Sequence, residues 1–229
     1  PPIIHSVPDI TAEAVVPYDN IIELQEPSAD DLLGVISIIN NAPQFFPVGE
    51  TIVTWTATDV GGNTASIEQK ITVVDTIFPT LRVPADIVIE ATSLDQNEVN
   101  LGEATSTDNG EIVSITNNAP QFFPVGETIV TWTTIDSSNN FSSLTQLVSV
   151  IDTTAPEISS LEDITFEATS VDANIVNLDS PTVSDIQDFT IYVIAPDVFP
   201  IGETIVTWTA VDTSDNSASV TQTITIVDT

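Results

Sequence analysis

The chain has 229 residues with 34 Asp and Glu against two Lys and Arg, which gives a formal net charge of −32 at pH 7. This charge repels nucleic acids and anionic membrane surfaces, which excludes both as partners, and it favours cations as partners of the crowded carboxylates. A mean hydropathy of +0.23 excludes a disordered chain, and the absence of cysteine excludes disulfides and thiolate metal sites.

One segment occurs three times along the chain. The hexapeptide Phe46–Thr51 returns as Phe123–Thr128 and as Phe199–Thr204, at offsets of 77 and 76 residues. The three tryptophans keep the same offsets: Trp55, Trp132 and Trp208. Self-similarity at a fixed period is the signature of repeated structural units. The sequence therefore predicts three domains, with boundaries at 1–75, 76–152 and 153–229.

Short segments rich in Val, Ile and Thr alternate in polarity within each repeat, which predicts strands. In the second repeat these are Ile87–Ala91, Val99–Ala104, Ile112–Thr116, Thr128–Thr134 and Leu144–Ile151. Turn residues separate them, and no stretch has the 3.6-residue period of a helix. Short strands and frequent turns predict an all-β fold in which each repeat is an antiparallel immunoglobulin-like β-sandwich.

The connections between repeats are short and contain proline. Asp75–Pro79 and Asp152–Pro156 lead directly from the last strand of one repeat into the next repeat. Proline restricts itself and the residue before it to extended conformations, so these connections are predicted to be stiff. Three tandem sandwiches joined in this way are expected to form an extended rod.

The repeated motifs resemble the HYR (hyalin repeat) domain family. The resemblance covers all three repeats and is carried by the run F-P-[VI]-G-E-T-I-V-T-W-T, an acidic turn such as Asp59–Asn63, and a strand that closes in V-[VI]-D-T. It implies an immunoglobulin-like module of extracellular and adhesion-related proteins. Family members often carry a cysteine pair, whereas Ile67, Leu144 and Val220 stand at the later position here, as in cysteine-free versions from prokaryotic surface proteins.

The acidic residues recur in register, and the topology of a sandwich places them at the joints between repeats. If the first strand runs from the upper to the lower end, Glu90 lies at the bottom of the second repeat, while Asp108 and Asp136 lie at its top. The first joint is then predicted to gather Glu13, Glu50, Asp75, Asp108 and Asp136. The second joint is predicted to gather the equivalent acids Glu90, Glu127, Asp152, Asp185 and Asp212.

Five converging carboxylates indicate a cation site. Calcium takes 6–8 oxygen ligands in flexible geometry, which suits such a cluster better than magnesium or zinc. The alternative is a solvated acidic surface, but a need for charge alone does not explain acids fixed in register at loop and linker positions. Two further half-sites are predicted at the ends of the chain, from Asp31 and Asp59 above and from Glu167 and Asp228 below. They imply a longer array of repeats or head-to-tail stacking into a filament.

These predictions favour an extracellular or cell-surface structural and adhesive spacer, part of a surface filament or adhesin stalk, with calcium at its joints. Its expected partners are neighbouring copies or further repeats of the same array. The start at Pro1 is typical of a mature or excised piece, and no run of about 18 apolar residues predicts direct membrane insertion.

Two other readings of the sequence are weaker. An enzyme is not expected, because no nucleophile–base pair, phosphate-binding loop or histidine-based metal motif is present. A glycan- or protein-binding accessory module is the alternative function, and the divergent segment Ile186–Pro196 of the third repeat is its candidate loop. One tryptophan per repeat at a fixed strand position is predicted to lie in the core rather than on a sugar-binding surface.

Overall fold

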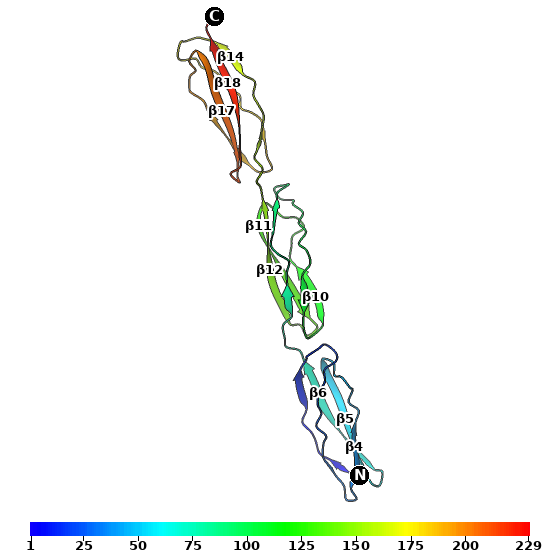
Figure 1. The fold of residues 1–229 in the computed structure, drawn as a ribbon. Helices are drawn as coiled ribbons and strands as arrows, with labels where there is room; N and C mark the ends of the chain where they lie inside the picture. Colours follow the sequence, from blue (N-terminus) through cyan, green and yellow to red (C-terminus); the bar gives the residue numbers. More distant parts are fainter. The chain divides into compact units, whose positions relative to one another are not determined.

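The computed structural model describes all 229 residues, and strands are its only regular secondary-structure elements (Figure 1). Each repeat has a four-stranded sheet and a two-stranded sheet, which confirms the predicted all-β fold. No helix of a length and hydrophobicity that would cross a membrane is present.

The first repeat contains six strands. They are Ile3–Ile4 (β1), Ile10–Glu13 (β2), Ala29–Asp30 (β3), Val35–Asn40 (β4), Gly49–Asp59 (β5) and Thr64–Val74 (β6). The four-stranded sheet has the order β2-β6-β5-β4, and β1 pairs with β3. Strands β5 and β6 form a long antiparallel hairpin, whereas β2 pairs with β6 in parallel.

The second and third repeats have the same arrangement. The second contains Thr80–Arg82 (β7), Ile87–Glu90 (β8), Thr105–Thr107 (β9), Ile112–Asn117 (β10), Gly126–Asp136 (β11) and Phe141–Ile151 (β12). The third contains Glu157–Ile158 (β13), Ile164–Glu167 (β14), Val183–Ser184 (β15), Phe189–Ile194 (β16), Gly202–Asp212 (β17) and Ser217–Val227 (β18). Their four-stranded sheets have the orders β10-β11-β12-β8 and β14-β18-β17-β16, again with one parallel pair each.

The chain forms two compact units, and each contains part of the second repeat. The first unit comprises residues 1–85, 101–119 and 129–146, and the second comprises residues 86–100, 120–128 and 147–229. The linker after β6 therefore lies in the same unit as the end of the second repeat that follows it. The linker after β12 lies in one unit with the whole third repeat.

The core follows from the alternation of the hairpin strands. In β5, Val53, Trp55 and Ala57 are buried while the threonines between them are more exposed, as expected for a half-buried strand. Ile71 and Val73 of β6 face the same core. The tryptophans are 3%, 6% and 5% exposed in the three repeats, which confirms the prediction that they lie in the core.

Two sequence predictions about segments are wrong. Val99–Ala104 is not a strand, because Gly102 adopts a φ of +79° and turns the chain, and the strand β9 begins only at Thr105. Ile186–Pro196 is not a loop, because its β-branched and aromatic residues form β16, which pairs with β17 without a register shift. The counterparts of β16, strands β4 and β10, each carry such a shift.

Candidate functional site

Three aspartates from three segments meet where the first repeat adjoins the second. Asp75 follows β6, Asp108 follows β9, and Asp136 is the last residue of β11. One carboxylate oxygen from each lies within 4.8 Å of the others. Asp75 and Asp136 are buried, at 7% and 1% exposure, and Asp108 is half-buried. The structure therefore brings together three of the five acids predicted for this joint.

Turns orient two of these carboxylates. Asp136 Oδ1 accepts hydrogen bonds from the backbone N–H groups of Ser138 and Asn140, both at 2.8 Å, and its Oδ2 accepts one from Asn140 Nδ2 at 2.8 Å. Asp108 Oδ2 accepts one from Gly110 N at 2.9 Å. Asn140 Nδ2 also donates to the backbone oxygen of Asp75 at 3.1 Å, so one amide ties the linker to the β11–β12 turn.

The cluster contains buried oxygen atoms without hydrogen-bond partners. They are Asp75 Oδ2, Asp108 Oδ1 and Asn109 Oδ1. Gly110 leaves room for the carboxylates of Asp75 and Asp108, since a Cβ there would overlap Asp75 Oδ2 and lie 3.0 Å from Asp108 Oδ2. A buried carboxylate oxygen with no partner carries a large desolvation penalty, which a bound cation would offset.

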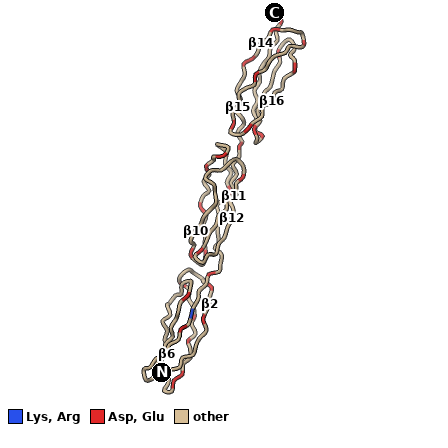
Figure 2. The backbone as a smooth tube through the Cα atoms, turned by 180° about the vertical axis from the view of Figure 1, so that it is seen from behind, with Lys and Arg blue, Asp and Glu red and all other residues tan.

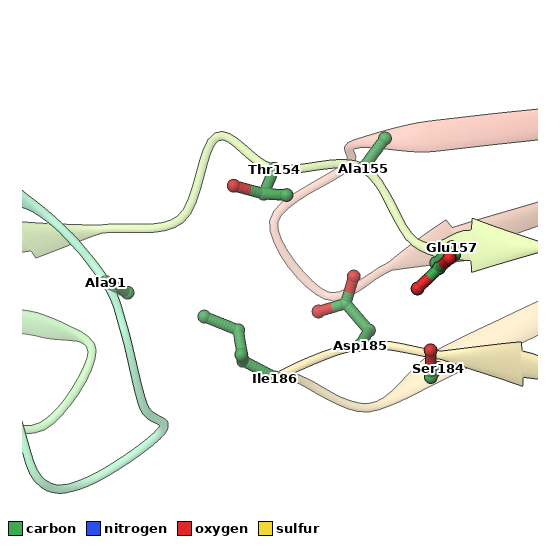
Figure 3. Close-up of a pocket in the computed structure, with 7 residues that line it drawn as sticks. All are labelled: Ala91, Thr154, Ala155, Glu157, Ser184, Asp185 and Ile186. Atoms are coloured by element: carbon green, nitrogen blue, oxygen red, sulfur yellow. The ribbon is translucent and has the colours of Figure 1, made fainter.

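The joint between the second and third repeats contains the equivalent trio of Asp152, Asp185 and Asp212, again with oxygens within 4.8 Å. Asp212 accepts from the backbone N–H of Ser214 and of Asn216, both at 2.8 Å. Asn216 Nδ2 donates to Asp212 Oδ2 at 2.9 Å and to the backbone oxygen of Asp152 at 3.0 Å. In Figure 3 the carboxylate of Asp185 points towards the linker that carries Thr154. Asp152 Oδ2 is buried without a partner.

Two of the four glutamates predicted for the joints, Glu13 and Glu90, bind threonines of the linkers. Glu13 accepts hydrogen bonds from Thr76 N at 2.7 Å and Thr76 Oγ1 at 2.9 Å. Glu90 accepts equivalent bonds from Thr153, both at 2.8 Å. The backbone and side-chain hydrogen bonds from Thr153 lower the pKa of Glu90 below its ordinary value. These carboxylates fix the linker beside each trio and do not belong to it.

The other predicted acids lie apart from the two trios. Glu50 forms an exposed ion pair with Lys70 at 2.8 Å, which raises the pKa of Lys70, and its counterpart Glu127 is exposed. Asp31 Oδ1 accepts from Leu33 N at 2.9 Å.

Asp59 accepts from the side chain and backbone N–H of Asn63, which lowers its pKa. Its Oδ2 lies 3.8 Å from the N-terminal nitrogen of Pro1. At the other end of the chain, Glu167 binds Thr229 as Glu13 binds Thr76, and Asp228 lines a cavity of about 210 Å³.

Sequence reasoning missed the amides of the site. Asn140 and Asn216 connect each linker to the following repeat, and Asn109 contributes to the first joint alone. The signal for the first two was present, because an Asn stands four residues after Asp59, Asp136 and Asp212. Asn109 had no such signal, since Ile186 occupies its place in the third repeat.

The site is chemically suited to a hard cation. Its donors are carboxylate, amide and backbone oxygens, and the chain offers no cysteine and only one histidine. Such all-oxygen sets with several carboxylates fit calcium, whereas zinc prefers nitrogen and sulfur ligands and magnesium keeps most of its waters. Figure 2 shows the positions of acidic residues along the backbone of all three repeats, and the chain has only two Lys and Arg residues to neutralise them.

Comparison with known proteins identifies the repeats. A family model described as the HYR domain matches residues 1–73, 74–150 and 151–226. Hyalin from Strongylocentrotus purpuratus is 37% identical over 222 residues, covering 89% of this chain and 18% of that protein. Hyalin from Lytechinus variegatus is 35% identical over 256 residues, covering 100% of this chain and 47% of that protein. The chain thus spans less than half of the length of either hyalin.

Solved structures of cadherins show a weaker likeness. Drosophila N-cadherin EC1–3 is 11% identical with a TM-score of 0.37, covering 97% of this chain and 99% of that one. Extracellular domains 3–6 of protocadherin gamma B2 are 12% identical with a TM-score of 0.37, covering 100% of this chain and 78% of that one. These scores are too low to add to the family assignment.

The assignment rests on matches to all three repeats and on sequence identities above 30% to two hyalins. Proteins with HYR domains are extracellular or lie at the cell surface, and this location applies to the repeats described above. The chain is therefore a member of the HYR domain family, built from three tandem extracellular repeats.

Proposed function

We propose that the chain is a non-enzymatic structural and adhesive spacer whose joints are stiffened by calcium. The observation that carries this proposal is the buried aspartate trio at each joint, with carboxylate oxygens that lack partners. Three ionised carboxylates within 4.8 Å repel one another strongly in a buried place. A divalent cation would turn that repulsion into attraction, and the linker would then be fixed to the following repeat.

Each trio combines a linker residue with two residues of the next repeat. At the first joint Asp75 would bind from the linker, while Asp108 would bind from the loop after β9 and Asp136 from the end of β11. Backbone oxygens and waters would complete the 6–8 oxygen ligands that calcium takes. The ion would supply charge neutralisation and a rigid cross-link, and the hydrogen bonds of Asn140 already hold two of the parts together.

The same geometry argues against catalysis. An active site is expected at one place in a chain, with its own set of titratable groups. The acids of the two joints instead occupy the same positions and have the same kind of hydrogen-bond partners. This supports a structural role for them.

We also propose that further repeats or neighbouring copies are the partners, arranged head to tail. Glu167 holds Thr229 through the same two hydrogen bonds that Glu13 and Glu90 make with the linkers. The segment around Asp228 therefore has the local structure of the two internal linkers. Asp31 and Asp59 of the first repeat occupy the positions of Asp108 and Asp136, where a preceding linker would dock.

Thermal unfolding of the full chain in calcium and in chelator, at matched ionic strength, tests the calcium proposal. Calcium at about 100 times its Kd should stabilise each filled site by about 2.7 kcal/mol and raise the melting temperature. Magnesium should have a smaller effect. Equal melting temperatures in calcium and in chelator would rule out the proposal.

Asp108→Asn and Asp31→Asn form a matched pair of variants, because the two residues hold equivalent turns. Asp108→Asn should lose the part of the calcium effect that comes from the first joint. In chelator it should be at least as stable as the wild type, since one repelling charge is gone. Asp31→Asn, which has no linker aspartate beside it, should keep the calcium response of both joints.

A further inference from the structure

The two joints differ at the residue that follows the loop aspartate. At the first joint this residue is Asn109, whose Nδ2 donates to the backbone oxygen of Ala14 at 2.9 Å and to Asp75 Oδ1 at 3.0 Å. Its Oδ1 is buried and has no partner. One side chain of the second repeat thus bridges two segments of the first and presents a free oxygen beside the aspartate trio.

The second joint has an apolar residue in this place. Ile186 points towards Ala91, the counterpart of Ala14, and both line a cavity of about 320 Å³ (Figure 3). Gln187 replaces Gly110, but its Nε2 donates to Ser214 Oγ at 2.7 Å and its Oε1 accepts from Thr213, so it is bonded within the third repeat. No side chain replaces the bridge or the oxygen that Asn109 supplies.

A second hydrogen bond across the first joint also has no counterpart at the second joint. Tyr18 of the first repeat donates a hydrogen bond to Glu111 of the second. The counterparts of these residues in the next joint are Asp95 and Asp188. Two ionised carboxylates have no hydrogen to donate and repel each other, so this bond cannot form there.

The first joint therefore has more buried oxygens that lack partners, and hydrogen bonds across it hold its parts together before any ion binds. Three buried oxygens without partners lie there, against one at the second joint. A preorganised site loses less free energy in ordering its ligands when the ion arrives. We propose that the first joint binds calcium more tightly than the second, by about tenfold, a factor typical of supporting residues around a metal. This inference rests on the proposed calcium function of the joints.

The consequence is an ordered response to calcium. Over a range of calcium concentration the first joint is filled while the second is empty. The link between the first and second repeats is then stiffened at low calcium concentrations. The link between the second and third repeats is stiffened only at higher ones.

Calorimetric titration of the calcium-free full chain with calcium, with four single variants, tests this order. The wild type should show a tight and a weak step. Asp136→Asn should remove the tight step, and Asp212→Asn the weak one. Asn109→Ile should weaken the tight step by about tenfold, and Ile186→Asn should strengthen the weak step or leave it unchanged. Asn109→Ala provides a second variant if the larger isoleucine disturbs folding, which circular dichroism in chelator would reveal.

The outcomes separate this inference from the function on which it rests. Two steps of equal affinity, or loss of the tight step in Asp212→Asn, would overturn the order of the joints while leaving calcium binding intact. A wild type that binds no calcium would overturn the proposed function as well.

Discussion

Glu90 uses both carboxylate oxygens to hold the linker after β12. Oε1 accepts from Thr153 N at 2.8 Å and from Thr154 Oγ1 at 3.1 Å, and Oε2 accepts from Thr153 Oγ1 at 2.8 Å. The hydrogen bonds from Thr153 lower the pKa of the Glu90 carboxyl from its ordinary 4.5, and the backbone hydrogen bond has the largest effect. A lowered folded-state pKa means that the stabilisation is present above the unfolded-state pKa and is lost as the pH falls through the folded-state pKa.

The stability of the chain in chelator should therefore fall below about pH 4.5, and part of that fall should be absent in Glu90→Gln. The amide of glutamine does not titrate, so the variant is less stable near neutral pH and loses less on acidification. Urea unfolding at a series of pH values measures this difference. Glu127→Gln, which replaces an exposed glutamate of the same repeat, serves as the control. Parallel pH profiles for the wild type and Glu90→Gln would contradict the prediction.

Single residues of the site were predictable where repetition and topology agreed. Asp75 and Asp136 recur in every repeat, at the end of a strand, so their meeting at one end of the sandwich could be inferred. Glu50 recurs equally well, but it stands beside Lys70 on the neighbouring strand and pairs with it. An acidic residue that recurs in register therefore indicates an equivalent position in each repeat, and the residue with which it interacts determines its role.

Among the elements, a buried asparagine organises the loop between β8 and β9. Asn97 Oδ1 accepts from Thr92 N at 2.8 Å and Ser93 N at 3.1 Å, and its Nδ2 donates to Ser93 O at 2.7 Å and Phe123 O at 2.9 Å. The side chain thereby satisfies four backbone groups and joins this loop to the segment before β11. Asn20 and Asn174 make the corresponding contacts in the other repeats.

Asn97→Leu should destabilise the second repeat by about 3 kcal/mol, because a side chain of similar size leaves buried backbone donors and acceptors unpaired. Asp95→Asn, on the exposed side of the same loop, should change the free energy of unfolding by less than about 0.5 kcal/mol. Urea unfolding followed by tryptophan fluorescence measures both. A loss in Asn97→Leu no larger than in the control would show that the loop does not depend on this side chain.

The long hairpin strands were predictable from local sequence, and the short strands were not. Alternation over eleven residues in β11 or β12 specifies which face is buried, whereas the three residues of β9 are too few to show any period. The parallel pairing of β8 with β12 joins residues about 60 positions apart, and no local pattern encodes it. The strand β16 was missed because it lacks the asparagines that mark the ends of its counterparts β4 and β10.

At the scale of the whole molecule, the net charge of −32 opposes any compact arrangement of the repeats in the absence of counterions. If calcium stiffens the joints, small-angle scattering should show a maximum dimension above about 100 Å in calcium, consistent with three sandwiches in line. In chelator the distance distribution should be broader and its mean shorter. Sodium chloride at the same ionic strength separates screening from binding.

The double variant Asp108→Asn/Asp185→Asn should scatter alike in calcium and in chelator, because each joint lacks one aspartate of its trio. An unchanged maximum dimension of the wild type in the two conditions would contradict stiffening by calcium.

The three tandem repeats themselves were predictable from the sequence, because the same motif recurs within the chain at nearly constant spacing. The different amides and apolar residues at the two joints were not, because they lie where the repeats diverge.

The identity of residues 40–56 with residues 117–133 has a consequence for folding. These segments include most of β5 and β11, which pair with β6 and β12 through backbone hydrogen bonds that do not distinguish one repeat from the other. During refolding, β5 can therefore pair with β12 as a wrong partner, and such exchange between neighbours is a common failure of repeat proteins. Synthesis from the N-terminus lessens this risk, because the first repeat can close its hairpin before the second has left the ribosome.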